Sequence, residues 1–128
     1  MLELKDKVID RRYSLEVGET YLVGRENNPR NNIILPWTDR IRNRNEIYKG
    51  REWILTVSRV VSRTHFRLYV DGDETLRLTD MSSEGIFDEE GKKIFGTNIL
   101  IEPDIDLYLG GSPRDRVLSY PIRLERKG

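Results

Sequence analysis

The stretch SRTHFRLYVDGDETLRLTDMSSEG, residues 62–85, predicts the fold more clearly than any other part of the chain. After His65, apolar residues occupy every second position through Val70, which is the period of a half-buried β-strand. The pair Asp71-Gly72 is a hairpin-turn signal, and Leu76 and Leu78 continue the alternation on the returning strand. The stretch therefore predicts an antiparallel β-hairpin that is flanked by two polar clusters.

The same alternation recurs outward along the chain, whereas helical periodicity is scarce. It is found near residues 2–4, 19–25, 98–101, 105–109 and 118–124, and glycine-containing turns separate several of these runs. Pro121 cannot donate a backbone hydrogen bond, so it predicts that the last strand lies at a sheet edge or that the proline is among its first residues. Many short strands at close spacing indicate one all-β domain over residues 1–128, an antiparallel sandwich or barrel.

Composition excludes several classes of site and of location. The 128 residues contain no cysteine and a single histidine, so disulfides, thiolate metal sites and cysteine nucleophiles are excluded. No apolar run approaches the ~18 residues of a membrane span, and the first residues lack a signal-peptide core. We expect an intracellular, cytoplasmic protein with no membrane contact, no metal site and no cofactor.

Charge is balanced overall but unevenly distributed. Residues 1–70 carry 14 Lys and Arg against 9 Asp and Glu, whereas residues 71–128 carry 8 against 13. This asymmetry is compatible with an anion-binding face and also with an ordinary solvated surface.

Three polar clusters follow or precede predicted strands. They are Gly24-Arg25, the run Ser62-Arg63-Thr64-His65, and the run from Asp80 to Gly85. Binding groups concentrate on loops that a rigid sheet holds in place, so these clusters are the candidates for a functional site.

In order and spacing, the three clusters resemble the motifs of the forkhead-associated (FHA) domain family. The resemblance runs from about Gly18 to Leu124 and includes DLYLG (106–110) and YPIRLER (120–126), which look like that fold's final hairpin. It implies an antiparallel SMAD/FHA-like β-sandwich of about eleven strands. It also implies that loops at one end of the sandwich bind a phosphothreonine peptide of a partner protein, in kinase-dependent signalling and without enzymatic activity.

The chemistry of the clusters suits a phosphate, which carries about −1.5 to −2 charges and offers three acceptor oxygens. Arg25 presents a planar fork that can bond two of these oxygens at once. We expect Ser62 and Ser83 to donate hydroxyl hydrogen bonds and Arg63 to add a second positive charge. Glu84 is expected beside the bound peptide.

Four further residues are expected to support the site. Gly24 and Gly85 allow close backbone approach or an unusual dihedral angle. Asp80 is interpreted as a loop-shaping acceptor and not as a catalytic acid. By resemblance, His65 is structural and holds the neighbouring loop through hydrogen bonds; no second histidine or cysteine accompanies it to form a metal site.

The chain departs from the family pattern in two places. Glu84-Gly85-Ile86 stands where the family has Asn-Gly-Thr, and an ionised glutamate only accepts hydrogen bonds. It therefore points away, selects a basic residue next to the phosphothreonine, or weakens phosphate binding. Residues 36–58 are longer than the usual connection, and we expect a hairpin-like loop excursion with exposed arginines.

Two alternative functions remain open at this point. Residues 40–67 carry eight basic side chains interleaved with Tyr48 and Trp53, a pattern that nucleic-acid binding also uses, although the neutral overall charge speaks against it. A degenerate FHA scaffold would bind partners without reading phosphate. The sequence has neither a glycine-rich phosphate loop nor a nucleophile with a credible base, so an enzyme is the least favoured class. The sequence does not indicate the partner's identity, the kinase or the oligomeric state.

Overall fold

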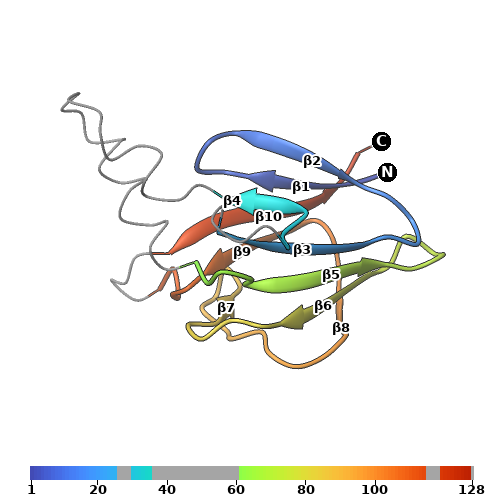
Figure 1. Cartoon of the computed structure of the whole chain (residues 1–128). Coiled ribbons are helices and arrows are strands. Elements are labelled where there is room, and N and C mark those ends of the chain that lie inside the picture. The colour runs from blue at the N-terminus through green and yellow to red at the C-terminus, as the bar shows by residue number, and fades with distance from the viewer. Residues whose placement is uncertain (26–29, 36–60, 115–118, 128) are drawn as a thin grey trace, which may run out of the picture.

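A computed structural model of the chain describes residues 1–25, 30–35, 61–114 and 119–127 (Figure 1). These residues form ten strands in two five-stranded sheets, and none of them forms an α-helix. Within this described part, no helix is long and apolar enough to cross a membrane. The prediction of an all-β sandwich is confirmed.

The first sheet has the strand order β2-β1-β10-β9-β7 and is antiparallel throughout. Its strands are β1 (Leu2–Asp6), β2 (Arg11–Leu15), β7 (Ile86–Phe87), β9 (Ile105–Leu109) and β10 (Tyr120–Arg126). The predicted final hairpin is the β9–β10 pair, in which Tyr120 lies opposite Leu109. The first and last strands of the chain, β1 and β10, also pair with each other at the centre of this sheet.

The second sheet has the order β4-β3-β5-β6-β8. It contains β3 (Thr20–Arg25), β4 (Ile33–Leu35), β5 (Phe66–Val70), β6 (Leu76–Asp80) and β8 (Ile99–Ile101). The predicted hairpin is confirmed as β5–β6. The sheet is mixed and not fully antiparallel, because β4 pairs parallel with β3.

Alternate residues of both sheets fill the space between them. The strands β1 and β5, and β10 from Tyr120 to Glu125, alternate between buried and more exposed positions. The largest fully buried side chains are Tyr120, Phe66, Leu2, Leu4, Ile33, Leu35, Leu68, Leu76, Leu78, Ile86, Leu107 and Leu109. Full burial of an aliphatic or aromatic side chain contributes about 1.5–3 kcal/mol relative to exposure, so this core is the main stabilising term.

The described residues contain ten strands where about eleven were expected, and the predicted excursion over 36–58 lies outside the described residues. The expectation that Pro121 marks an edge strand is wrong, because β10 lies between β1 and β9. The alternative expectation, that Pro121 is among the first residues of its strand, is confirmed, since it is the second residue of β10. Its carbonyl accepts a hydrogen bond from Lys7 N at 3.2 Å.

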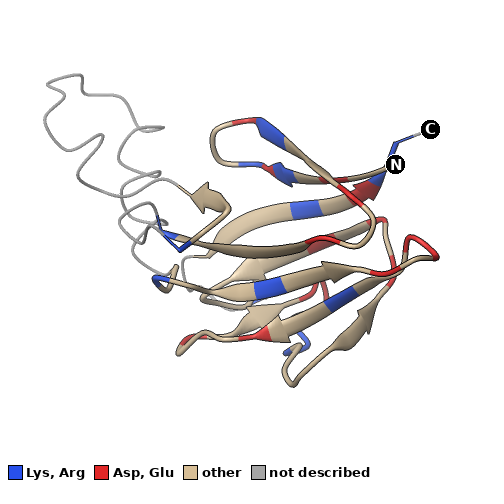
Figure 2. Cartoon of the chain, turned by 45° about the vertical axis from the view of Figure 1, so that its right-hand side comes forward, with Lys and Arg blue, Asp and Glu red and all other residues tan. Residues whose placement is uncertain are grey.

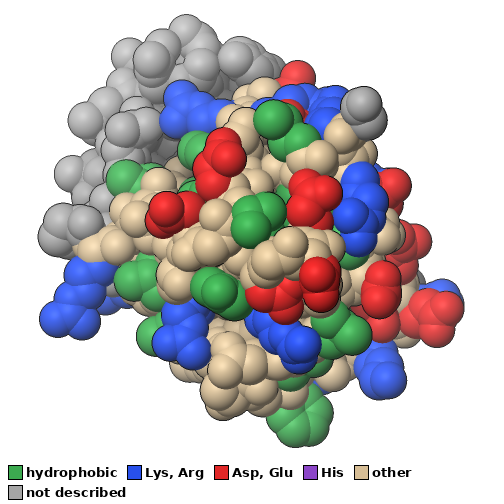
Figure 3. Space-filling model, turned by 90° about the vertical axis from the view of Figure 1, so that its right-hand side faces the viewer, with side chains coloured by type: hydrophobic (Ala, Val, Ile, Leu, Met, Phe, Trp, Pro, Cys, Tyr) green, Lys and Arg blue, Asp and Glu red, His purple; other side chains and the backbone are tan. Residues whose placement is uncertain are grey.

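The two ends of the sandwich differ in charge (Figure 2). Basic residues mark the end of β3 and the segment before β5, at the end where Arg25 and Arg63 lie. The opposite end holds the β2–β3 and β5–β6 turns, which carry Glu16, Glu19, Asp71, Asp73 and Glu74. Viewed from that end, acidic side chains are prominent among other types (Figure 3). Asp80 and Glu84 also lie at the Arg25 end, so the positive charge there is local to the two arginines.

Candidate functional site

Strand register brings the three polar clusters to one end of the second sheet. Val23 of β3 lies opposite Phe66 of β5, and Phe66 lies opposite Asp80 of β6. The end of β3, the start of β5 and the end of β6 are therefore neighbours in space. The loops that follow or precede them carry Arg25, Ser62 and Ser83.

Ser62 connects all three clusters through its backbone and its hydroxyl. Its carbonyl accepts a hydrogen bond from Arg25 N at 3.2 Å. Its Oγ accepts one from Ser83 N at 3.3 Å. Arg25 and Ser83 are more than fifty positions apart in sequence, yet each donates a backbone hydrogen bond to the half-buried Ser62.

Gly24 permits this close approach. A Cβ atom added at Gly24 would lie 2.1 Å from the Arg63 carbonyl oxygen and 2.8 Å from Thr64 Cα. Both atoms belong to the backbone, so no side-chain rotation relieves the clash. The residue before the arginine must be glycine for the Ser62–Thr64 loop to pack against β3.

Two guanidinium groups are placed near one another at this end. Arg25 is half-buried and Arg63 is exposed. Burial, and secondarily the positive charge of Arg63, lower the pKa of the Arg25 guanidinium below its ordinary value. Repulsion between two cations is relieved by an anion bound between them, so the pair favours a ligand with concentrated negative charge.

His65 is fully buried and joins the second and third loops. The N–H of Ser62 donates to His65 Nδ1 at 3.0 Å, and His65 Nε2 lies 2.8 Å from the Gly85 carbonyl oxygen. Because Nδ1 accepts, Nε2 carries the proton and donates to Gly85. Burial lowers the pKa of this histidine, which keeps the ring neutral. These contacts are those of a structural residue.

The third loop is shaped by its own side chains. Asp80 Oδ1 accepts hydrogen bonds from Ser82 N at 3.0 Å and from Ser82 Oγ at 2.6 Å, and Ser82 Oγ accepts one from Gly85 N at 2.8 Å. Gly85 has a φ of 95°, which favours glycine. Ser83 and Glu84 are left exposed at the tip of the loop.

Asn31 is a supporting residue that the sequence analysis did not single out. Its Nδ2 donates to the carbonyls of Arg25 at 2.9 Å and Arg63 at 2.6 Å. Its Oδ1 accepts from Thr64 Oγ1 at 3.1 Å, and the residue is only 7% exposed. The side chain thus fixes the two arginine-bearing segments to each other. Asn31 lies in the polar run 26–32, which contains four asparagines, and the sequence alone does not distinguish the supporting one from the others.

The assembled site can recognise an anion. It offers two cationic side chains, two serine hydroxyls and a rigid loop framework, all from residues named in the sequence analysis. Within the described ranges, no group of three or more histidine or carboxylate side chains is placed to hold a metal ion.

Comparison with known families matches residues 21–94 to the FHA domain. The match covers more than half of the chain and contains all three clusters. The chain belongs to the FHA domain family.

Solved FHA domains share the fold at low sequence identity. The N-terminal FHA domain of Rad53p from Saccharomyces cerevisiae, in complex with a phosphothreonine peptide, is 15% identical with a TM-score of 0.64; the alignment covers 98% of this chain and 93% of that one. The FHA domain of CT664 protein from Chlamydia trachomatis is 19% identical with a TM-score of 0.61, covering 99% and 96%. The FhaA FHA domain, complexed with the intracellular domain of Rv3910, is 20% identical with a TM-score of 0.61, covering 98% and 100%. No curated protein matches the chain.

Glu84, at one of the two expected departures from the family pattern, lies in the third loop of this FHA domain. The side chain is exposed beside the buried His65 ring, whose pKa it raises slightly against the larger effect of burial. Its carboxylate therefore contributes negative charge at the end of the domain where Arg25 and Arg63 contribute positive charge.

Proposed function

We propose that this FHA domain is a non-enzymatic interaction module that binds phosphorylated segments of partner proteins and reads phosphothreonine. Arg25 and Arg63 supply charge and guanidinium hydrogen bonds to the phosphate. Ser62 and Ser83 supply hydroxyl donors, and Glu84 contacts the residues next to the phosphothreonine. Gly24, His65, Asp80 and Gly85 hold these groups in place, in one domain that comprises residues 1–128.

The observation that carries the proposal is the junction at Ser62. Its carbonyl holds the backbone of Arg25, and its hydroxyl holds the backbone of Ser83. A phosphate placed there meets groups from three segments at once. Each charged hydrogen bond contributes about 1.5–3 kcal/mol net, so two or three of them with peptide backbone contacts reach the ~8 kcal/mol of a micromolar complex.

The known complexes support the same ligand class. The Rad53p FHA domain is in complex with a phosphothreonine peptide, and an engineered FHA domain is described with a Myc-pTBD peptide. The two neighbouring arginines agree with an anionic ligand at the Arg25 end.

The test is a calorimetric titration with peptides from an oriented phosphothreonine library, each beside its unphosphorylated and phosphoserine twins. We expect micromolar binding of the phosphothreonine form only, and loss of at least tenfold in affinity with Arg25→Ala, as removal of one charged hydrogen-bonding group predicts. Arg126→Ala is the matched control, because Arg126 is an exposed arginine at the end of β10.

Other outcomes identify the alternatives. Equal binding of phosphoserine and phosphothreonine would reject the threonine preference but keep phosphate recognition. Partner binding that survives both phosphatase and Arg25→Ala would indicate a scaffold that does not read phosphate. Affinity for any nucleic acid that falls steeply with salt would indicate a nucleic-acid-binding domain.

A further inference from the structure

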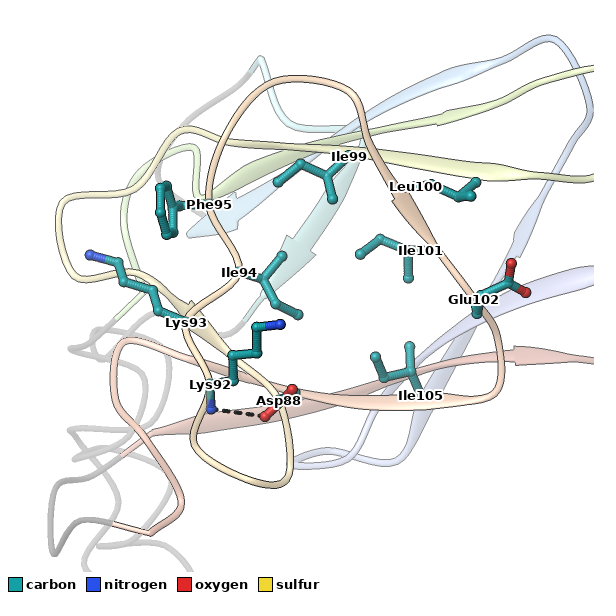
Figure 4. A pocket seen from close by; sticks show the side chains of 10 residues that line it. All are labelled: Asp88, Lys92, Lys93, Ile94, Phe95, Ile99, Leu100, Ile101, Glu102 and Ile105. Carbon is teal, nitrogen blue, oxygen red and sulfur yellow. Dashed lines mark hydrogen bonds between the residues drawn. The ribbon is translucent and has the colours of Figure 1, made fainter.

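A groove opens at the side of the sandwich, next to the third polar cluster but lined by no residue of the three clusters. It has a volume of about 390 Å³ and lies between β8 and the segment 92–95 (Figure 4). Four isoleucines form its interior: Ile94, Ile99, Ile101 and Ile105. At its border Phe95 is 69% exposed and Leu100 is 48% exposed. Binding sites of this volume are commonly apolar with a few charged groups at the border, and this groove has that composition.

The strand that borders the groove suits an extended peptide. β8 is the last strand of the second sheet, and among the described residues only β6 pairs with it. The outer edge of such a strand presents backbone N–H and C=O groups, which an extended segment can pair with while its side chains enter adjacent pockets. A peptide therefore fits this groove better than a compact ligand does.

Lys93 connects the groove with the third loop of the phosphate site. A Cβ atom added at Gly85 would lie 3.0 Å from Lys93 Cε, so the lysine stem passes over this glycine. The same residue lines the groove, and Figure 4 shows Lys93 and Phe95 on the same side of it. The groove thus begins one side chain away from the loop that carries Ser83.

The two ends of the groove carry charges of opposite sign. Lys92 and Lys93 are exposed at one end, and Glu102 is exposed at the other (Figure 4). Asp88 also lines the groove, but its Oδ1 accepts hydrogen bonds from the backbone N–H groups of Glu90 and Lys92 within its own turn. An acidic peptide residue is therefore favoured at the lysine end, close to the phosphate site.

We infer that this groove is a second docking site for the same phosphorylated partner. It binds the extended segment that flanks the phosphothreonine, with an acidic residue toward Lys92 and Lys93 and an apolar side chain against Phe95 and Ile99. The inference rests on the proposed function, since the phosphate site supplies the first contact.

The experiment uses two libraries with a fixed phosphothreonine. The short library varies only the positions next to the phosphothreonine, and the long one also varies more distant positions on both sides. We expect only the long library to select an acidic residue and, further from the phosphothreonine on the same side, an apolar residue. A selected long peptide should bind about tenfold more tightly than the same peptide with alanine at the apolar position, the effect of a well-buried interface side chain.

Variants then locate the contact. Phe95→Ala should remove this tenfold gain and leave the affinity for the short peptide unchanged, whereas Val17→Ala, which truncates another exposed apolar residue, should do neither. Lys93→Glu should abolish the preference for an acidic residue, and Lys127→Glu, at an exposed lysine, should keep it.

Three results would overturn the inference. In the first, the long library shows no preference at the distant positions. In the second, Phe95→Ala keeps the tenfold gain in affinity of the long peptide. In the third, Phe95→Ala lowers the affinity for the short and the long peptide equally. If the short peptide binds and the long one gains nothing, only the groove fails. If no phosphorylated peptide binds at all, the proposed function fails and the groove with it.

Discussion

Replacing Gly24 with alanine should displace the segment that carries Ser62 and Arg63. The new Cβ would lie 2.1 Å from the Arg63 carbonyl oxygen, which is 1.3 Å short of the 3.4 Å at which ordinary contact begins. Overpacking of this kind costs about 1–3 kcal/mol. The Asn31 hydrogen bond to the same carbonyl, 2.6 Å long, adds about 0.5–1.5 kcal/mol when it is lost. We therefore expect a decrease of about 1.5–4.5 kcal/mol in the free energy of unfolding.

Urea unfolding followed by circular dichroism measures this decrease. Gly72→Ala is the matched control, because an added Cβ at Gly72 meets no atom within 4 Å. We expect the control to unfold like the parent protein. Gly24→Ala should also lower the affinity for phosphothreonine peptide, under conditions in which the variant is still folded. A Gly24→Ala protein as stable as Gly72→Ala would refute the close packing of β3 against the Ser62 loop.

Three further predictions concern buried and exposed polar groups. Burial lowers the pKa of His65, so the folded state favours the neutral ring; stability should be complete above the ordinary pKa of 6.5 and decrease as the pH falls below it. Urea midpoints measured across this range should show the slope, and His65→Gln should remove it. Tyr120→Phe removes the hydroxyl that donates to the buried Asp6 carboxylate at 2.7 Å, and should lower the free energy of unfolding by about 1–3 kcal/mol, whereas Tyr69→Phe, at an exposed tyrosine, should change it little. Glu84→Asn removes a like charge beside the phosphate and should raise phosphopeptide affinity about fivefold, the equivalent of ~1 kcal/mol; unchanged or weaker binding in calorimetry would show that Glu84 does not face the ligand.

Most strands could be predicted from the sequence, because side-chain alternation is a local property of an extended chain. β5 and β10 show this, since their alternate residues are buried as the pattern indicated. The position of a strand within its sheet is not local, and of the two alternatives that Pro121 left open, an edge strand or a place among the first residues, only the second holds. A proline lacks the N–H but keeps its carbonyl, which Lys7 N uses, so the second residue of a central strand tolerates it.

The candidate site was only partly predictable. Arg25, Ser62 and Ser83 stand out because strand ends and residue types mark them. The parallel β3–β4 pairing and the role of Asn31 follow from how the chain returns after Arg25, which no periodicity encodes. Lys93 was also missed, because its relation to Gly85 depends on the turn between β7 and the segment 92–94.

The most direct test of the central claim is a crystal structure of the protein with a bound phosphothreonine peptide. The account predicts a phosphate within hydrogen-bonding distance of the Arg25 guanidinium and of the Ser62 and Ser83 hydroxyls, at the end of the second sheet where β3 ends and β5 begins. A phosphate bound elsewhere, with Arg25 directed away from it, would contradict the account.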